Sequence, residues 1–312
     1  MRAYVCGPMT GLPDFNFPAF FDAASALRSL GHGVENPADN DGPTCATSLA
    51  GALAAKEAGA TWADYMRRDL PRIAKCDAVV VLPGWQRSRG ASLEVDIATR
   101  LGMPIMCILR TSTFSTVRSG VFDEYHKWTL VPRIRAMGLS GYARSGKDTV
   151  GGILVAKHGY IRASFADKLK ELTLLIDPIV GYPGELDDIT LFETVDAVGW
   201  GDAKENPEVR RLLQAIGTGV RDIIGPDTWV NLAMRDLPDG SKVVFTDARF
   251  DSEANAIKAA GGEVWRVERP GHGPVNGHVS ETALDAWPFD AYICNDAGLD
   301  VLAHRVAVTV TP

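Results

Sequence analysis

A glycine-rich segment near the middle of the chain constrains the fold more than any other feature. Residues 141–149 read Gly-Tyr-Ala-Arg-Ser-Gly-Lys-Asp-Thr, after the apolar run 133–140 and before a helix-period segment. The spacing G-x-x-x-x-G-K between a strand and a helix is typical of a phosphate-binding loop. Glycines permit the tight turn that points backbone N–H groups and the helix N-terminus at a phosphate, and lysine neutralises charge. The segment therefore predicts phosphate binding on an α/β domain.

The residue after the loop lysine sets where a magnesium ion would bind. Ser or Thr is usual at that position, but Asp148 stands there and Thr149 follows, so either is a candidate Mg²⁺ ligand. A chance glycine turn is disfavoured because the flanking elements also fit. The predicted contacts to ATP are Gly141, Arg144, Ser145, Gly146, Lys147, Asp148 and Thr149.

Short β-like runs alternate with helix-period segments along most of the chain. This rhythm is typical of parallel sheets covered by helices. It falters across the polar stretch 111–131 and then restarts, and a chain of 312 residues is long enough for two domains. We therefore expect an α/β protein with a domain at 1–112, a linker at 113–131 and a second domain at 132–312.

The C-terminal half resembles the phage-type deoxynucleoside monophosphate kinases. The shared motifs are SGYARSGKDT, residues 164–168 (SFADK), residues 212–229 (LLQAIGTGVRDIIGPDTW) and residues 246–250 (TDARF), and the resemblance spans about residues 133–312. It implies a P-loop kinase-like parallel sheet that uses ATP and Mg²⁺ to phosphorylate a deoxynucleoside monophosphate.

The same resemblance implies an acceptor pocket at the ends of the strands. Arg249 is expected to act in transfer beside Lys147, because guanidinium groups bind phosphate in a bidentate manner and phosphoryl transfer depends on positioning and charge. The other predicted pocket residues are Asp167, Arg221 and Asp247. The alternative for each is structural: Arg221 on a helix face, or Asp247 as a helix cap.

The N-terminal half is similar to the nucleoside 2-deoxyribosyltransferase superfamily over about residues 1–110. Residues 4–11 (YVCGPMTG) and 82–98 (LPGWQRSRGASLEVDIA) carry the resemblance, which implies a Rossmann or flavodoxin-like parallel sheet. It further implies that Glu94 attacks the sugar of a deoxyribonucleoside or its monophosphate, with Asp69 as a second carboxylate and Tyr4 in the active site. The alternative is that Glu94 is an exposed carboxylate paired with Arg100.

Small residues after two strands of this half are candidates for binding a 5′-phosphate. Gly7 and Thr10 follow the first strand, and Ser88 and Gly90 precede a helix after the 77–84 strand. Backbone N–H groups at such positions bind anions.

Composition limits the partners. The net charge of −7 argues against binding of polymeric nucleic acid, and no apolar stretch is long enough for a membrane span. The five cysteines form no C-x-x-C pair, which indicates a reducing cytoplasm, that of a host cell if the source is a phage. The resemblance of the N-terminal half raises the expectation of a homo-oligomer through that domain.

The leading hypothesis is a bifunctional enzyme of deoxynucleotide metabolism, with a kinase and an N-glycosidic bond-cleaving or base-exchanging domain. Two alternatives remain open. The N-terminal domain could be a nucleotide sensor without catalysis, or the loop could belong to an ATPase that needs no nucleotide acceptor.

Overall fold

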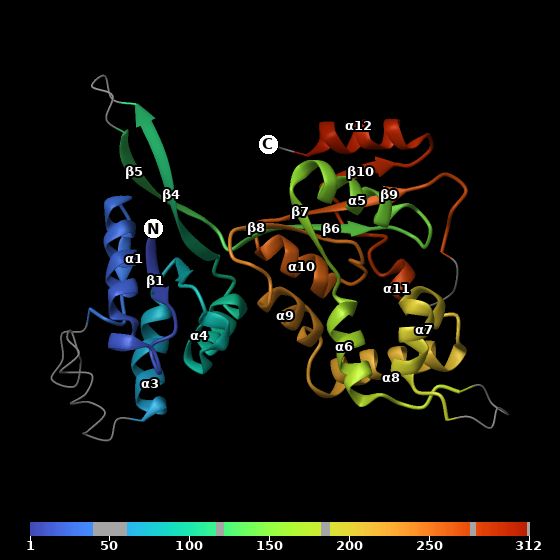
Figure 1. The fold of residues 1–312 in the computed structure, drawn as a ribbon, viewed down its shortest axis with the longest axis horizontal. Helices are drawn as coiled ribbons and strands as arrows, with labels where there is room; N and C mark the ends of the chain where they lie inside the picture. Colours follow the sequence, from blue (N-terminus) through green and yellow to red (C-terminus); the bar gives the residue numbers. More distant parts are fainter. Residues whose placement is uncertain (40–60, 117–121, 182–187, 275–278, 311–312) are drawn as a thin grey trace. The chain divides into compact units, whose positions relative to one another are not determined.

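The computed structural model describes residues 1–39, 61–116, 122–181, 188–274 and 279–310 and divides into two compact units (Figure 1). Both units are α/β structures built on mainly parallel sheets, which confirms the predicted fold class. The first unit comprises Met1–Arg135, Pro238–Ser241 and Ala259–Gly261, and the second comprises Ala136–Leu237, Lys242–Lys258 and Gly262–Pro312.

In the first unit, strands and helices alternate up to β4, and β5 follows β4 directly. The strand order over the described residues is β2-β1-β3-β4-β5, with neighbouring strands parallel except β5, which is antiparallel to β4. The elements are β1 (Arg2–Cys6), η1 (Pro13–Asn16), α1 (Phe17–Ser29), β2 (Gly33–Glu35), α3 (Trp62–Ile73), β3 (Ala78–Val81), η2 (Trp85–Arg87), α4 (Arg89–Arg100), β4 (Ile105–Thr116) and β5 (Phe122–Pro132).

The central strands β1 and β3 of this unit are apolar because helices cover both of their faces. Successive side chains of a strand point to opposite faces. Tyr4 and Val79 accordingly pack with Val95 of α4 on one face. Val5 packs with Phe20 of α1 on the other face. The two faces of the sheet thus bury separate clusters.

The structure differs from the expected linker at 113–131. Strand β4 continues to Thr116 and β5 begins at Phe122, and their antiparallel register pairs Met106 with Pro132 and Thr116 with Phe122. Residues 117–121 lie outside the described part. An antiparallel pair satisfies backbone N–H and C=O groups whatever the polarity of its side chains, so a polar sequence can form it.

In the second unit, the strand order over the described residues is β10-β9-β6-β8-β7, with β9 parallel to both β10 and β6, and β7 parallel to β8. The elements are β6 (Ile134–Ser140), α5 (Lys147–His158), β7 (Tyr160–Ala163), α6 (Ala166–Ile176), α7 (Leu191–Ala203), α8 (Pro207–Ile223), α9 (Thr228–Arg235), β8 (Ser241–Phe245), α10 (Asp251–Ala259), β9 (Glu263–Glu268), α11 (Val279–Thr282), β10 (Ala291–Cys294) and α12 (Leu299–Thr309).

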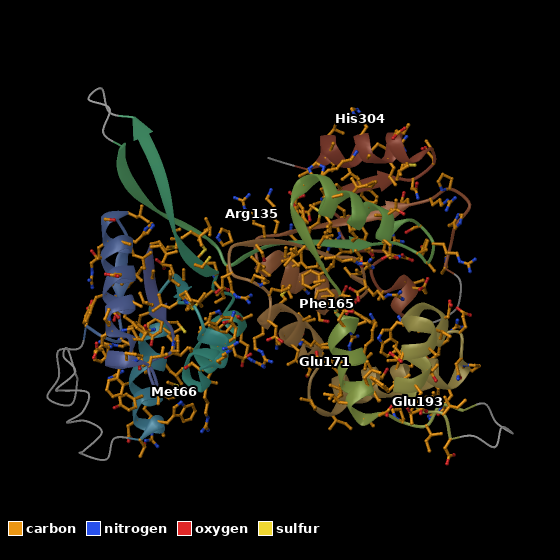
Figure 2. All side chains as sticks on the ribbon, in the orientation of Figure 1. Met66, Arg135, Phe165, Glu171, Glu193 and His304 are labelled. Atoms are coloured by element: carbon orange, nitrogen blue, oxygen red, sulfur yellow. The ribbon has the colours of Figure 1, made fainter. Side chains whose placement is uncertain are left out.

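The centre of this second sheet is buried between helices. Leu139 of β6 packs with Leu154 of α5 and Val306 of α12. Phe165, at the start of α6 and labelled in Figure 2, stacks on Phe245 with ring centroids 4.2 Å apart. Parallel strands end at the same edge of a sheet, and the glycine-rich loop follows β6 at that edge. Among the described helices of both units, none is long and apolar enough to span a bilayer.

Candidate functional site

The glycine-rich loop joins β6 to α5 in a backbone conformation that requires glycine at both ends. Gly141 has φ 144° and Gly146 has φ 106°, a region that side chains rarely allow. A Cβ atom on Gly141 would lie 2.3 Å from the carbonyl oxygen of Val267, and one on Gly146 would lie 2.4 Å from Nδ2 of Asn295. The loop therefore closes tightly before α5 begins at Lys147, and no side chain caps this helix start. The first N–H groups of a helix have no partner within the helix and favour an anion.

Lys147 folds over this loop. Its Nζ donates to the carbonyl oxygens of Gly141 at 2.6 Å and Tyr142 at 2.8 Å. Burial, and after it the nearby charge of Arg249, lower the pKa of Lys147 to about 8. An anion at the loop would favour the charged ammonium, so Lys147 fits the binding of a phosphate.

Other loop residues are held by the strand ends around them. Ser145 is buried, and its carbonyl oxygen accepts from Nδ2 of Asn295 at 2.9 Å. The Ser145 hydroxyl has no hydrogen-bond partner within the described structure. Arg144 is exposed and has φ 63°, a left-handed conformation that is rare outside glycine. The loop is thus a preformed cradle that a phosphate can fill.

The two candidate magnesium ligands lie in the first turn of α5 and are exposed. The Asp148 side chain is 74% exposed and forms an ion pair with Arg162, and Thr149 is exposed as well. The described residues contain no group of three or more His, Cys, Asp or Glu side chains that could hold a metal ion. Mg²⁺ usually keeps several waters and binds through one or two protein oxygens and the substrate phosphates. These two residues fit that mode.

Asp247, predicted to contact the acceptor, instead accepts hydrogen bonds from the residues at the start of α6. Its carboxylate accepts from the Ser164 hydroxyl at 2.6 Å and from the N–H groups of Phe165 at 3.0 Å and Ala166 at 3.1 Å. The sequence left open that Asp247 caps the helix after it. The structure instead places it at the N-terminus of α6, across the sheet from β8 to β7.

Replacing Asp247 by alanine is expected to destabilise the protein by about 2 kcal/mol, because three donors lose a charged acceptor. Urea unfolding of the two proteins measures the difference. The matched control is Asp167→Ala, which removes an exposed carboxylate paired with Lys170 at 2.8 Å. That change is expected to cost less than about 1 kcal/mol. Equal losses in the two variants would contradict a capping role for Asp247.

Arg221 and Arg249 meet at a buried carboxylate, that of Glu253. Arg221 forms an ion pair with Glu253 at 2.9 Å and lies over the ring of Phe250, 3.9 Å from its centroid. Glu253 also accepts from the backbone N–H of Arg249 at 2.7 Å. Burial raises the pKa of Glu253 to about 7. This arrangement fixes the Arg249 backbone.

Two lysines that the sequence analysis missed gather near Arg249. Burial lowers the pKa of Lys204; the charges of Lys170 and Arg249 also lower it, while those of Asp247 and Asp167 oppose the shift. Asp167, paired with Lys170, belongs to the same region. A cluster of cations favours binding of an anion. Lys204 stands at the C-terminal end of α7, where no motif marked it.

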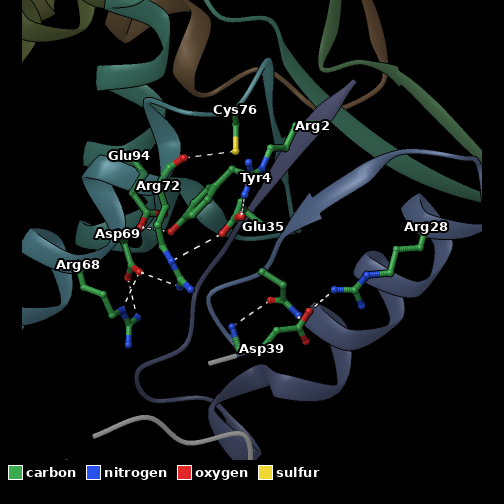
Figure 3. Close-up of polar contacts among 12 residues, drawn as sticks. Arg2, Tyr4, Arg28, Glu35, Asp39, Arg68, Asp69, Arg72, Cys76 and Glu94 are labelled. Carbon is green, nitrogen blue, oxygen red and sulfur yellow. Dashed lines mark hydrogen bonds and ion pairs between the residues drawn. The ribbon is translucent and has the colours of Figure 1, made fainter. Parts of the chain in front are cut away.

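The predicted catalytic carboxylate of the first unit, Glu94, is buried beside a tyrosine. The hydroxyl of Tyr4 on β1 donates to Oε1 of Glu94 on α4 at 3.0 Å, and Glu94 is 6% exposed (Figure 3). Burial raises the pKa of Glu94 to about 7, while hydrogen bonds from Cys6 and Tyr4 oppose this rise. The alternative of an exposed pair with Arg100 is wrong, because Arg100 pairs with Asp96 at 3.0 Å.

Asp69 lies near this pair and is itself held by arginines. Arg68 binds it in a bidentate manner, with both N–O distances 2.8 Å. Arg72 forms two longer ion pairs: its Nη1 lies 3.9 Å from Oδ1 of Asp69, and its Nε lies 3.7 Å from Oε2 of Glu35 (Figure 3). The charge of Asp69 contributes to the raised pKa of Glu94. The structure therefore brings Tyr4, Asp69 and Glu94 together, as the sequence predicted for these three side chains.

The four residues predicted to bind a 5′-phosphate have mixed surroundings. The Ser88 hydroxyl caps α4 by accepting from the N–H of Ala91 at 3.3 Å. Gly7 is required for packing, because a Cβ there would lie 2.8 Å from Cβ of Leu82. Thr10 is exposed in a turn, and Gly90 is in the first turn of α4, one turn before Glu94. Ser88 and Gly90 thus lie at the start of α4, the helix that carries Glu94.

The two units match different protein families. Residues 1–107 match the family described as "Domain of unknown function (DUF4406)". Residues 187–306 match the family described as "Deoxynucleotide monophosphate kinase". The first match names no activity, so the deoxyribosyltransferase resemblance stays a prediction.

Two solved kinase structures share parts of this layout at low similarity. Dephospho-CoA kinase from Campylobacter jejuni is 15% identical, covers 56% of this chain and 95% of its own, and has a TM-score of 0.32. A mutant APS kinase of Mycobacterium tuberculosis is 17% identical, covers 57% of this chain and 97% of its own, and has a TM-score of 0.26. The strand order described above, and not these likenesses, carries the fold assignment.

Two viral proteins match the chain in sequence, and both carry the words deoxynucleotide monophosphate kinase in their names. The protein of Enterobacteria phage T4 is 33% identical over 111 residues, which are 33% of this chain and 45% of that protein. The protein of Acanthamoeba polyphaga mimivirus is 32% identical over 173 residues, which are 47% of this chain. Because the match covers 81% of the mimivirus protein, the chain belongs to the deoxynucleotide monophosphate kinase family.

Proposed function

We propose that the second unit transfers the γ-phosphoryl group of ATP to a deoxynucleoside monophosphate. The observation that carries this proposal is the preformed loop, with Lys147 folded over it and Arg249 within its electrostatic reach. The loop N–H groups and Lys147 would hold the ATP phosphates. Asp148 and Thr149 would hold Mg²⁺, which when bound neutralises charge between the phosphates. The family match supports a deoxynucleotide as the acceptor.

The cations near Arg249 give the acceptor a place to bind. Lys170 and Lys204 would bind the phosphate of the acceptor. Arg249 would lie between that phosphate and the γ-phosphate of ATP. In-line transfer needs the attacking oxygen beside the γ-phosphate and needs the negative charge stabilised, with little covalent chemistry from the protein. Asp247 then contributes indirectly, because it holds the start of α6, the helix that carries Lys170.

Dependence on the acceptor tests this proposal. We expect ATP consumption to require an added deoxynucleoside monophosphate, and the product to be the diphosphate. The measurement is chromatographic separation of ATP, ADP and deoxynucleotides after incubation with Mg²⁺ and each monophosphate in turn. Hydrolysis of ATP at the same rate without any acceptor would contradict the kinase proposal and favour an ATPase.

For the first unit we propose cleavage of the N-glycosidic bond of a deoxynucleoside or its monophosphate. The supporting observation is the buried Tyr4–Glu94 pair with Asp69 nearby. An ionised Glu94 would attack the anomeric carbon as the base departs, and water or a second base would then release the sugar. Tyr4 would hold the attacking carboxylate in place. Release of free base from a deoxynucleotide is the test, and its absence for every base would favour a nucleotide-sensing role.

A further inference from the structure

The carboxylate of Glu281, which no sequence motif marked, contacts both the phosphate loop and Arg249. Glu281 lies on α11, between β9 and β10. Its Oε2 accepts from the backbone N–H of Ala143 at 3.4 Å, and its Oε1 accepts from Nη1 of Arg249 at 3.2 Å. The side chain is 8% exposed. A largely desolvated carboxylate therefore links the loop to an arginine that follows a different strand.

A second carboxylate from the same segment fixes where Glu281 lies. Asp285 accepts from the hydroxyl of Tyr142, in the loop, at 3.0 Å and from Nη2 of Arg266 at 2.8 Å. The Arg266 guanidinium is buried and lies over the Tyr142 ring, 4.5 Å from its centroid. The segment 281–285 is thus attached to the phosphate loop at two points.

The contact with Glu281 restricts the side chain of Arg249. The Arg249 side chain is 42% exposed. A long arginine side chain has many rotamers, and holding it in one costs conformational entropy. A buried carboxylate offsets that cost, because its attraction for a cation is stronger where water is excluded. The charge of Glu281 also acts on Lys147, whose ammonium it favours.

We infer that Glu281 is a positioning residue of the phosphoryl-transfer site, and that its carboxylate orients Arg249 toward the γ-phosphate held by the loop. This inference rests on the proposed kinase function. Charge on the transferred group is stabilised in the transition state by correctly placed cations. Loss of orientation therefore lowers kcat more than it weakens ATP binding.

The experiment compares Glu281→Gln, Arg249→Ala and the double variant in the diphosphate assay. Glu281→Gln keeps the shape of the side chain and removes its charge, and it is expected to lower kcat on the order of 10- to 100-fold. KM for ATP is expected to change less than about threefold. Because Glu281 acts through Arg249, the double variant should be no slower than Arg249→Ala alone.

Two controls separate positioning from a general effect on the fold. Glu171→Gln makes the same chemical change in an exposed ion pair with Lys168 on α6 and should retain wild-type kcat (Figure 2). Glu281→Asp keeps the charge on a shorter side chain and should recover part of the rate. Thermal unfolding of each variant reports whether it is folded. A folded Glu281→Gln variant with recovery in Glu281→Asp supports the inference.

Three results would overturn it. Wild-type kcat in Glu281→Gln would show that orientation by this carboxylate is unnecessary. A lower KM for ATP with unchanged kcat would show that the carboxylate competes with the γ-phosphate for the loop. Additive losses in the double variant would show that Glu281 does not act through Arg249. If the wild-type protein itself forms no diphosphate, the proposed function fails, and this inference fails with it.

Discussion

Replacing Lys147 by alanine is expected to lower kcat/KM for diphosphate formation on the order of 10²- to 10³-fold, as loss of one preorganised cation at a charged transition state does. Lys147 is the loop residue whose ammonium already lies over the carbonyl oxygens of Gly141 and Tyr142. Burial and the charge of Arg249 lower its pKa to about 8, while the charges of Glu281 and Asp148 oppose the shift. A bound phosphate would add negative charge beside the ammonium, so we expect the lysine to interact more strongly when substrate is bound.

The matched control is Lys157→Ala. Lys157 is an exposed lysine in the last turn of the same helix, α5, and its removal should leave kcat/KM unchanged. Initial rates at varied ATP and deoxynucleoside monophosphate measure the effect. Equal rates in the Lys147 and Lys157 variants would show that the loop lysine does not contribute to the reaction. If neither wild type nor Lys157→Ala forms diphosphate while ATP is hydrolysed, the acceptor assignment is wrong instead.

Glu94→Gln is expected to abolish release of free base, with a loss on the order of 10⁴-fold or more, because an amide cannot replace a carboxylate nucleophile. The change keeps the size of a side chain that is 6% exposed. It also leaves an oxygen that can accept from Tyr4. The matched control on the same helix is Asp96→Asn, which breaks a half-exposed pair with Arg100 and should retain the activity.

The pH dependence provides a separate check on Glu94. Burial raises its pKa to about 7. The carboxylate must be ionised to attack the sugar, so the rate of base release should rise between about pH 6 and pH 8 and level off above it. A rate that falls over this range would mean that Glu94 acts in its protonated form. Base release that persists in Glu94→Gln would move the chemistry to another residue.

The sequence located most of the residues near the phosphate loop but assigned some of them to different tasks than the structure does. Gly141 and Gly146 could be predicted from the sequence, because the loop needs a positive φ at these positions and glycine adopts it readily. Asp247 was found as a strand-end residue, yet its three hydrogen bonds go to the start of α6. Asp247 caps α6 because β7 lies beside β8 in the sheet. Strand order cannot be predicted from the local sequence.

The first unit shows the same division. Tyr4 and Glu94 are 90 positions apart in the sequence. Their hydrogen bond forms because α4 packs on the face of β1 toward which Tyr4 points. Family resemblance suggested both residues. Burial, which raises the pKa of Glu94, and the bidentate hold of Arg68 on Asp69 became visible only in the folded chain.

Sequence alone determined the α/β class and the phosphate loop of this protein, because hydrophobic periodicity and glycine conformation are local properties of the chain. Tertiary structure decided which charged groups meet. Lys204 and Glu281 carry no local signal, since a lysine at a helix end and a glutamate in a short helix are ordinary surface residues in sequence. They acquire their surroundings when distant strands place Arg249 beside them. Electrostatic interactions depend on distance through space, and only the fold sets that distance.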